Sequence, residues 1–241
     1  MMKKPPVDER TLAAARFVRQ GSRIADVGCD HAYCAIYLCI EGICRGGVCS
    51  DIRPGPLSRA EENIRLYGMT SLLHTKLCDG LEGLETEEPD DILIMGMGGE
   101  TVAGILERAS FVRDEHIRLI LQPMTQQDVL RRWLCENGFA ISDEAVCTAG
   151  DKRYQIICAG YTGKKTELSD AALWLGEHNI KRYLQGDGTP QNDCFAAMLA
   201  HRIDVTEKQY EGLCRAGEDA SVPQRLLCEL YRIRERRNGT E

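Results

Sequence analysis

Apolar residues recur along the first 160 positions in two alternating patterns, one typical of short buried strands and one of helices. Strands are expected at 23–27, 47–50, 72–78, 91–95 and 118–121. Helices are expected at 11–20, 32–40, 54–67, 101–109 and 126–137. This alternation predicts a parallel sheet covered by helices on both faces.

The pattern changes after residue 138, where two β-rich segments follow each other directly. They cover 139–148 and 154–161, and Ala149-Gly150-Asp151-Lys152 between them is typical of a hairpin turn. We therefore predict an α/β, Rossmann-like fold whose seven-stranded sheet is mostly parallel and ends in an antiparallel hairpin.

Beyond Gly163 the strand pattern disappears and helical periodicity takes over. Helices are expected at 168–185, 191–215 and 222–236, interrupted at Gly186-Asp187-Gly188 and at Gly217. The sequence thus predicts a Rossmann-like domain over residues 1–163 and a small helical domain over 164–241.

Composition narrows the classes of protein that this chain could represent. None of the apolar segments is long enough to span a bilayer, and Met1 to Arg10 carries charges and prolines. We therefore expect a cytoplasmic protein without a membrane partner, a monomer or a weak homodimer. The net charge of −7 argues mildly against nucleic acid, but the basic run at Arg232, Arg234, Arg236 and Arg237 leaves RNA open.

The 12 cysteines raise the question of metal sites and disulfides. No two of them are spaced as Cys-x-x-Cys, and the histidines do not stand at zinc-ligand spacing. Most of the cysteines lie in apolar segments, where a thiol packs as a small apolar group. We expect reduced, structural cysteines and no metal.

The first strand ends in Ala-Asp-Val-Gly-Cys-Asp-His-Ala, residues 25–32. Gly28 lets a ligand approach the backbone, but the later glycines of a dinucleotide-binding loop are replaced by Asp30 and Ala32. The Asp30 carboxylate would repel a pyrophosphate at the helix start, which disfavours a nicotinamide oxidoreductase. Asp26 and Asp30 would instead attract a cationic sulfonium and its ammonium group.

Acidic residues also follow the next two strands. Asp51 ends the second strand, where a carboxylate commonly binds ribose hydroxyls, and Asp79-Gly80-Leu81 follows the third, where a carboxylate could accept from an adenine amino group. Each aspartate could merely cap a helix or turn. Their joint position at three strand ends favours a ligand site.

The fourth strand ends in Gly96-Met97-Gly98-Gly99, which predicts a surface free of large side chains on which a base could lie. A tight turn is the alternative interpretation. Gln122-Pro123 ends the fifth strand beside it, and the amide could contact a base edge.

These motifs, in this order, closely resemble the bacterial tRNA adenine-N1 methyltransferases that act on the adenine at position 22. The resemblance rests on Ala-Asp-Val-Gly-Cys-Asp-His-Ala-Tyr, Ser-Asp-Ile-Arg-Pro-Gly-Pro-Leu, Asp-Gly-Leu, Gly-Met-Gly-Gly and Leu-Gln-Pro-Met. Trp133-Leu134, Asn137-Gly138-Phe139, Lys152 and Tyr154 also look like the family. The resemblance covers about residues 10 to 162, and the helical tail is similar to the family's coiled-coil-like domain.

The resemblance implies a class I methyltransferase fold, S-adenosyl-L-methionine as cofactor and tRNA as substrate. The implied cofactor-binding residues are Asp26, Gly28, Cys29, Asp51, Ile52, Asp79, Gly80, Leu81, Gly96 and Met97. The implied substrate-binding residues are Gly98, Gly99, Gln122, Pro123 and Tyr154. On the C-terminal helices, phosphate contacts are expected from Arg182, Arg225, Arg232 and Arg236, for which a solvated helical face is the alternative.

The chain departs from the family at a few positions. Cys29 stands where serine or threonine is usual and Cys34 where leucine is usual. The family's Ser-x-Arg-Leu appears as Glu9-Arg10-Thr11-Leu12, which puts contacts from that segment in doubt.

The expected reaction needs little acid–base chemistry, because adenine N1 carries an in-plane lone pair. The site must align N1, methyl carbon and sulfur, and stabilise the charge that moves onto the base. Asp30 is the catalytic candidate for that stabilisation and His31 for orientation or proton removal. The alternatives for this pair are a helix cap and a solvated histidine.

Two other functions stay open on the sequence alone. One is a methyltransferase of the same fold that acts on a small molecule or a protein, which salt-dependent tRNA binding would distinguish. The other is a non-catalytic RNA-binding module, which could fail to bind the cofactor.

Overall fold

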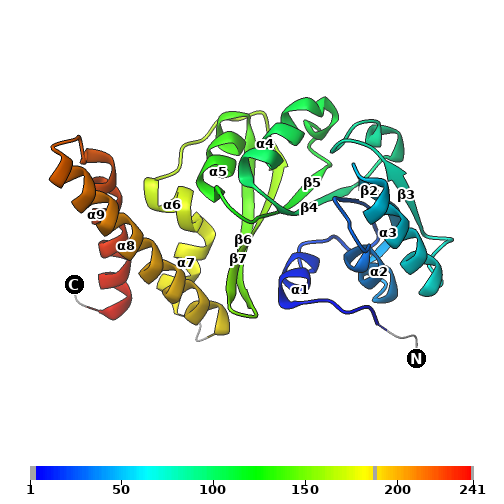
Figure 1. The fold of residues 1–241 in the computed structure, drawn as a ribbon, viewed down its shortest axis with the longest axis horizontal. Coiled ribbons are helices and arrows are strands. Elements are labelled where there is room, and N and C mark those ends of the chain that lie inside the picture. Colours follow the sequence, from blue (N-terminus) through cyan, green and yellow to red (C-terminus); the bar gives the residue numbers. More distant parts are fainter. Residues whose placement is uncertain (1–3, 187–188, 240–241) are drawn as a thin grey trace.

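A single seven-stranded sheet organises the first two thirds of the chain (Figure 1). The structure is a computed structural model that describes residues 4–186 and 189–239. Along the sheet the strand order is β3-β2-β1-β4-β5-β7-β6, with β7 antiparallel to both neighbours. The strands are β1 Ser22–Val27, β2 Cys44–Asp51, β3 Leu73–Leu77, β4 Asp91–Met97, β5 Arg118–Pro123, β6 Phe139–Ala149 and β7 Lys152–Tyr161. The predicted mostly parallel sheet with an antiparallel edge hairpin is confirmed.

Helices cover both faces of the sheet, as the burial of alternate strand residues requires. In β1, Ile24 packs into the core under one set of helices and Ala25 into the core under the other. The first face carries α1 Glu9–Ala15, α2 Tyr33–Ile40 and α3 Pro54–Leu66, and the second carries α4 Gly99–Arg108 and α5 Gln127–Glu136 (Figure 1). Two short 3-10 turns, η1 Leu84–Glu87 and η2 Ser110–Val112, flank α4 in sequence.

The first helix is shorter than predicted. It begins at Glu9 and ends at Ala15 instead of continuing to residue 20. The backbone N–H and the Nε of Arg19 each donate to the carboxylate of Asp91, at 2.7 Å. Because Asp91 is fully buried at the start of β4, these bonds stabilise a turn at Arg19 in place of another helical turn.

In the described residues after Gly163, four helices form the C-terminal end of the molecule: α6 Asp170–Leu175, α7 Glu177–Gln185, α8 Pro190–Ala216 and α9 Ser221–Asn238. The single helix predicted over 168–185 is wrong, because Gly176 interrupts it with φ +87°. A Cβ there would lie 2.3 Å from Oε2 of Glu144, so only glycine fits. Asp187 and Gly188, part of the next predicted break, lie outside the described residues.

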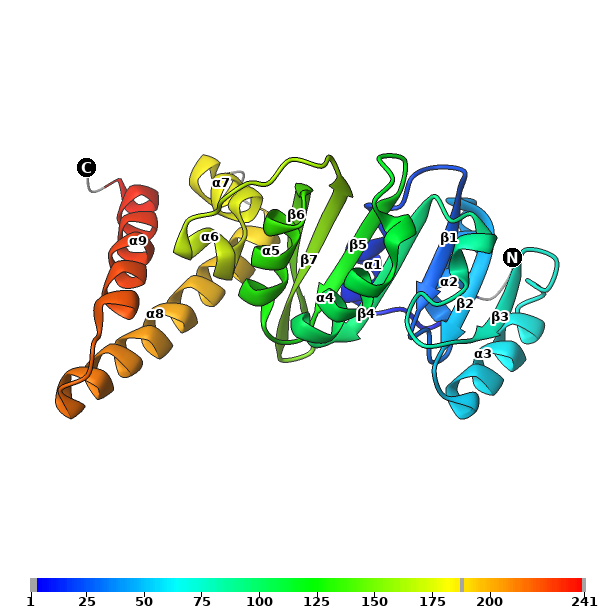
Figure 2. The ribbon, with the colours of Figure 1, turned by 90° about the horizontal axis from the view of Figure 1, so that it is seen from above.

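The long helix α8 leads away from the sheet. After a turn at Gly217, α9 packs against α8 (Figure 2). Their shared apolar core includes Phe195, Leu199 and Leu230, and it also takes in Val146 from β6. The helices are therefore packed directly against the edge hairpin of the sheet.

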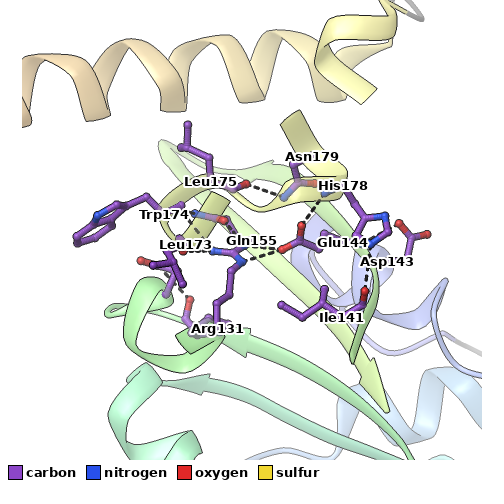
Figure 3. A network of polar contacts seen from close by, with 12 residues as sticks. Arg131, Ile141, Asp143, Glu144, Gln155, Leu173, Trp174, Leu175, His178 and Asn179 are labelled. Carbon is purple, nitrogen blue, oxygen red and sulfur yellow. Dashed lines mark hydrogen bonds and ion pairs between the residues drawn. The ribbon is translucent and has the colours of Figure 1, made fainter. Parts of the chain in front are cut away.

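A buried ion pair reinforces this junction (Figure 3). Arg131 of α5 and Glu144 of β6 are both fully buried, with 2.8 Å between Nε and Oε1. Arg131 also donates to Gln155 Oε1 at 2.6 Å and to the carbonyl of Leu173 at 2.9 Å, while Glu144 Oε2 accepts from the His178 N–H at 3.0 Å. Sheet, α5, α6 and α7 thus share one hydrogen-bonded network.

Candidate active site

Loops from three strands meet at the carboxyl edge of the sheet. The N–H groups of Gly28 and Cys29 donate to the carbonyl of Ser50, at 2.8 and 3.0 Å, which ties the β1–α2 loop to β2. Gly28 has φ +72°, and a Cβ on it would lie 2.3 Å from the methyl group of Met97. The ends of β1, β2 and β4 are therefore as close as the shared ligand site predicted from sequence requires.

Two residues of the β1–α2 loop adopt left-handed backbone conformations without being glycine. Asp30 has φ +43° and Ala32, which precedes α2, has φ +55°. Such conformations cost about 1–3 kcal/mol each and occur often at functional sites. Here they place the Asp30 side chain at the surface of the loop, where 54% of it is exposed.

The Asp30 carboxylate has a cationic partner that sequence reasoning missed. Arg59 of α3 donates through Nη2 to Oδ1 at 2.7 Å, and His31 Nε2 lies 3.6 Å from Oδ2. The hydrogen bond from Arg59, followed by the nearby His31, keeps the pKa of Asp30 below its ordinary value. Asp30 is therefore ionised at neutral pH.

His31 is held from two sides. Its ring stacks on Tyr33, with centroids 5.2 Å apart and an interplanar angle of 10°, and its carbonyl accepts from Asn63 Nδ2 at 3.0 Å. Asn63 and Arg59 stand four residues apart on α3, and this spacing places both on the helix face turned to the loop. The spacing relates Arg59 to Asn63 but relates neither of them to the β1–α2 loop, so no local motif identifies them as partners of that loop.

Asp26 lies beneath the loop. The side chain is buried, and its carboxylate accepts from the N–H of Ala35 in the first turn of α2. Burial raises the pKa of Asp26 to about 6. Contact between Asp26 and an ammonium group stays a prediction, and it would use the small part of this carboxylate that is accessible.

A buried carboxylate, that of Asp51, and the exposed side chain of Ile52 lie next to each other at the end of β2. Asp51 Oδ1 accepts from the Arg53 N–H at 2.8 Å, an arrangement that fixes the carboxylate. Ile52 is 60% exposed, so its side chain is available to cover an apolar ligand surface. This is the arrangement expected around a ribose and the face of a base.

Asp79, Gly80 and Leu81 turn toward α4. Asp79 Oδ1 lies 3.4 Å from Arg108 Nη2, and a Cβ on Gly80 would lie 2.9 Å from Ile105. Leu81 is buried. The predicted contact from Asp79 to an adenine amino group would therefore compete with Arg108. Gly80 and Leu81 pack toward α4, and cofactor binding by them stays a prediction.

The amide of Gln122 supports the glycine-rich loop from inside the protein. Gln122 is fully buried, and its Oε1 accepts from the Gly96 N–H and from Arg10 Nη1, both at 3.2 Å. Contact between this amide and a base edge, as predicted from sequence, is not supported. Pro123 is buried as well.

The loop after Gly96 is tied to the segment that follows β5. The Met97 carbonyl accepts from the Met124 N–H at 2.7 Å, and the Gly99 N–H donates to the Thr125 carbonyl at 2.8 Å. A Cβ on Gly99 would lie 2.1 Å from the Gln126 carbonyl, while Gly98 directly precedes α4. Gly99 is thus required for packing, whereas Gly96 is exposed and a Cβ on it would make only ordinary contact with Arg10 Nη1, at 3.6 Å.

Arg10 connects α1 to this side of the site. Besides its bond to Gln122, its guanidinium lies over the Tyr154 ring, 5.6 Å from the centroid. The departure of this segment from the family's motif had put its contacts in doubt, yet the structure brings Arg10, Gln122, Gly96 and Tyr154 together.

The C-terminal arginines do not converge on the site. Arg182 pairs with Asp143 and donates to the Glu144 carbonyl, so it stabilises the junction instead of presenting a free charge. Arg225 pairs with Asp170 at 2.5 Å. Arg232 and Arg236 lie on α9 beside a cavity shared with α6 and α7. Phosphate binding by these four residues stays a prediction, weakest for Arg182.

Residues 4–186 and 189–239 contain no cluster of three or more metal-ligating side chains. Among the helices of these residues, none is both long and apolar enough to cross a membrane.

Comparison with known proteins identifies the family of this chain. A family model described as a methyltransferase domain matches residues 7–157, which span all the strand ends described above. The chain belongs to the methyltransferase domain family.

The similarity of this methyltransferase domain protein to its relatives also covers the C-terminal helices. The tRNA (adenine(22)-N(1))-methyltransferase of Bacillus subtilis is 27% identical over 225 residues, 93% of each chain. A Streptococcus agalactiae protein of the NADB-Rossmann superfamily has a TM-score of 0.81 and 27% identity, covering 95% of this chain and 98% of its own. A Streptococcus pneumoniae protein solved with S-adenosyl-L-methionine has a TM-score of 0.76 and 29% identity, covering 95% and 99%.

Proposed function

We propose that this protein transfers the methyl group of S-adenosyl-L-methionine to N1 of an adenine in tRNA, at position 22. The observation that carries the proposal is the shared edge at which the β1, β2 and β4 loops meet, with Asp30 ionised and Ile52 exposed beside Asp51. The relatives support it, because one is a tRNA (adenine(22)-N(1))-methyltransferase and another was solved with S-adenosyl-L-methionine and shares the fold along its length.

The residues present fit this cofactor. A Cβ on Gly96 would meet only Arg10 Nη1, at 3.6 Å, so the backbone there is open to a ligand. Asp51 would hold the ribose hydroxyls and Ile52 would cover one face of the cofactor's adenine, next to the Gly28 turn. Bound there, S-adenosyl-L-methionine supplies an electrophilic methyl group on a sulfonium.

The remaining chemistry belongs to the chain's own side chains. The target base must leave its stack to reach the edge of the sheet, and it must present N1 in the ring plane. Asp30, ionised and held by Arg59, would accept from the adenine amino group and so stabilise positive charge on the methylated base. His31, stacked on Tyr33, would orient that base.

On the other side of the site, Arg10 and Gln122 would keep the glycine-rich loop in place. Neither donates a proton to the base in this proposal. Because tRNA is the proposed substrate, we also propose that the protein acts in the cytoplasm, as a monomer or weak homodimer. We keep residues 1–163 as the proposed cofactor-binding domain and 164–241 as the proposed tRNA-binding domain.

The experiment that tests the proposal uses the full chain, unmodified tRNA and cofactor labelled in its methyl group. We expect label in tRNA and, after nuclease mapping, 1-methyladenine at position 22. Asp51→Ala should weaken cofactor binding roughly 10- to 100-fold by calorimetry, because hydrogen bonds to a charged group contribute about 1.5–3 kcal/mol. Methylation elsewhere, or transfer only to a small molecule or a protein, would contradict the substrate assignment. Absence of cofactor binding would indicate a non-catalytic module.

A further inference from the structure

A groove opens between the edge hairpin of the sheet and the C-terminal helices, next to the candidate active site. It encloses about 520 Å³ and is lined by the β5–α5 loop, the start of β7, α6 and α8. Tyr154, whose ring lies under the Arg10 guanidinium of the active site, forms part of its wall. The groove therefore begins where the glycine-rich loop and its supports end.

One wall holds an arginine stacked on tryptophan. The guanidinium of Arg202, on α8, lies 3.5 Å from the centroid of the Trp174 ring. Within residues 4–186 and 189–239 this guanidinium makes no hydrogen bond or ion pair, and burial lowers the pKa of Arg202. A stacked arginine keeps the edge of its planar fork free, which suits bidentate donation to a phosphate.

The backbone of Trp174 is held in place by the buried network at the junction. Its carbonyl accepts from Arg131 Nη1 at 3.3 Å and from Gln155 Nε2 at 3.1 Å. Figure 3 shows the Trp174 ring pointing away from that network. The platform under Arg202 is thus rigid before any ligand arrives, which reduces the entropic cost of binding.

The opposite wall adds two more cations. Lys152 and Arg153 begin β7 and are exposed, and neither takes part in an ion pair within the described part of the chain. The acidic group that faces Arg202 is Asp128 of α5, which acts at longer range than an ion pair. Positive charge therefore predominates in the groove although the whole chain carries −7.

We propose that this groove binds the phosphates of the tRNA strand next to the nucleotide being methylated. Arg202, Lys152 and Arg153 would donate to phosphate oxygens, and Tyr154 would mark the point where the strand enters the active site. The inference rests on the proposed function. It adds that the phosphates beside the methylated nucleotide are bound by residues other than those of the methyl-transfer site. It also moves the expected phosphate contacts from Arg182 and Arg225, which are paired, to cations that are not.

The test measures tRNA binding over a range of salt concentrations for Arg202→Gln and for the double variant Lys152→Gln/Arg153→Gln. Arg113→Gln is the matched control. Arg113 is an exposed arginine in the loop that precedes β5, at the amino ends of the parallel strands and so on the side away from the groove. We expect about tenfold weaker tRNA binding for Arg202→Gln. The slope of log K against log salt should fall by about 0.7–0.9 for each phosphate that the variant no longer binds.

Cofactor affinity separates this inference from the proposed function. It should stay within about twofold of wild type in both groove variants, because the groove lies outside the cofactor site. Affinity and salt slope equal to those of Arg113→Gln would overturn the groove while leaving the proposed function intact. A wild-type protein that neither binds nor methylates tRNA would overturn the proposed function itself. The double variant alters only exposed side chains, so it keeps the test valid if Arg202→Gln folds poorly.

Discussion

Two arginine–carboxylate pairs in this molecule have nearly the same geometry and opposite surroundings. Arg59 and Asp30 approach to 2.7 Å at the active site, and Arg131 and Glu144 to 2.8 Å at the junction with the C-terminal helices. The side chains of the first pair are 49% and 54% exposed, and those of the second are fully buried. Distance alone therefore says little about what an ion pair does.

Exposure to solvent decides how much each of the two ion pairs contributes to stability. An exposed pair contributes about 0–1 kcal/mol to stability, so it can exchange its partner for a ligand at small cost. A buried pair has given up its hydration and depends on every remaining hydrogen bond. Glu144 and Arg131 have such bonds, to Gln155 and to backbone groups of α6 and α7. The junction pair is structural, and the active-site pair is available for recognition.

The largest expected effect tests the buried pair. Arg131→Met should lower the free energy of unfolding by about 3–5 kcal/mol, because it leaves the Glu144 charge buried without its partner. Urea denaturation followed by circular dichroism measures this. Arg59→Met is the control and should cost less than about 1 kcal/mol. Equal destabilisation in the two variants would remove the distinction between the pairs.

The same contrast explains why truncation at residue 163 is a poor test of tRNA binding. Removing 164–241 would expose Val146 and would take away the carbonyl and N–H partners of Arg131 and Glu144. The cofactor-binding domain would then be destabilised for reasons unrelated to RNA. Point variants in the groove avoid that problem.

The second prediction compares a buried carboxylate with the exposed one. Burial raises the pKa of Asp26 from 3.8 to about 6, so the folded state binds a proton more tightly than the unfolded state. Stability should therefore fall as pH rises from about 4 to 6, by roughly 3 kcal/mol at most. Asp26→Asn keeps an acceptor for the Ala35 N–H and should abolish this decrease, leaving the variant more stable than wild type at pH 7.5.

Urea unfolding at pH 4.5 and 7.5 measures the effect, with Asp30→Asn as the control. The pKa of Asp30 is lowered by Arg59, so its contribution to stability has the opposite sign and decreases as pH falls. A pH slope in Asp26→Asn as steep as in wild type would show that another group is responsible.

The sheet could be predicted from sequence because its strands are buried on alternate faces and each is followed by a helix or turn signal. Helix limits were harder. The early end of α1 depends on Asp91, 72 residues from Arg19, and the break at Gly176 depends on Glu144 across the junction. Local periodicity contains no information about such long-range contacts.

The candidate site, too, could be predicted from sequence only in part. The meeting of the strand-end loops of β1, β2 and β4 was predicted correctly, because parallel strands end at one edge. The direction of one side chain was not, because Gln122 is fully buried and holds Arg10. The contact of Asp79, which lies 3.4 Å from Arg108, with an adenine amino group stays a prediction. Arg59 and Arg202 act through partners on other elements, Asp30 and Trp174, so no local motif identifies them.

The smallest expected effect concerns the exposed pair. Asp30→Asn should reduce the turnover number for tRNA methylation about tenfold, because the amide accepts more weakly from the adenine amino group and carries no charge to stabilise the methylated base. Cofactor affinity should change less than twofold. Arg59→Gln separates the two roles of the pair: if Arg59 only holds Asp30, this variant should retain most of the turnover, since the carboxylate keeps its charge. Full turnover in Asp30→Asn would mean that the Asp30 pair, like the Arg131 pair, is structural.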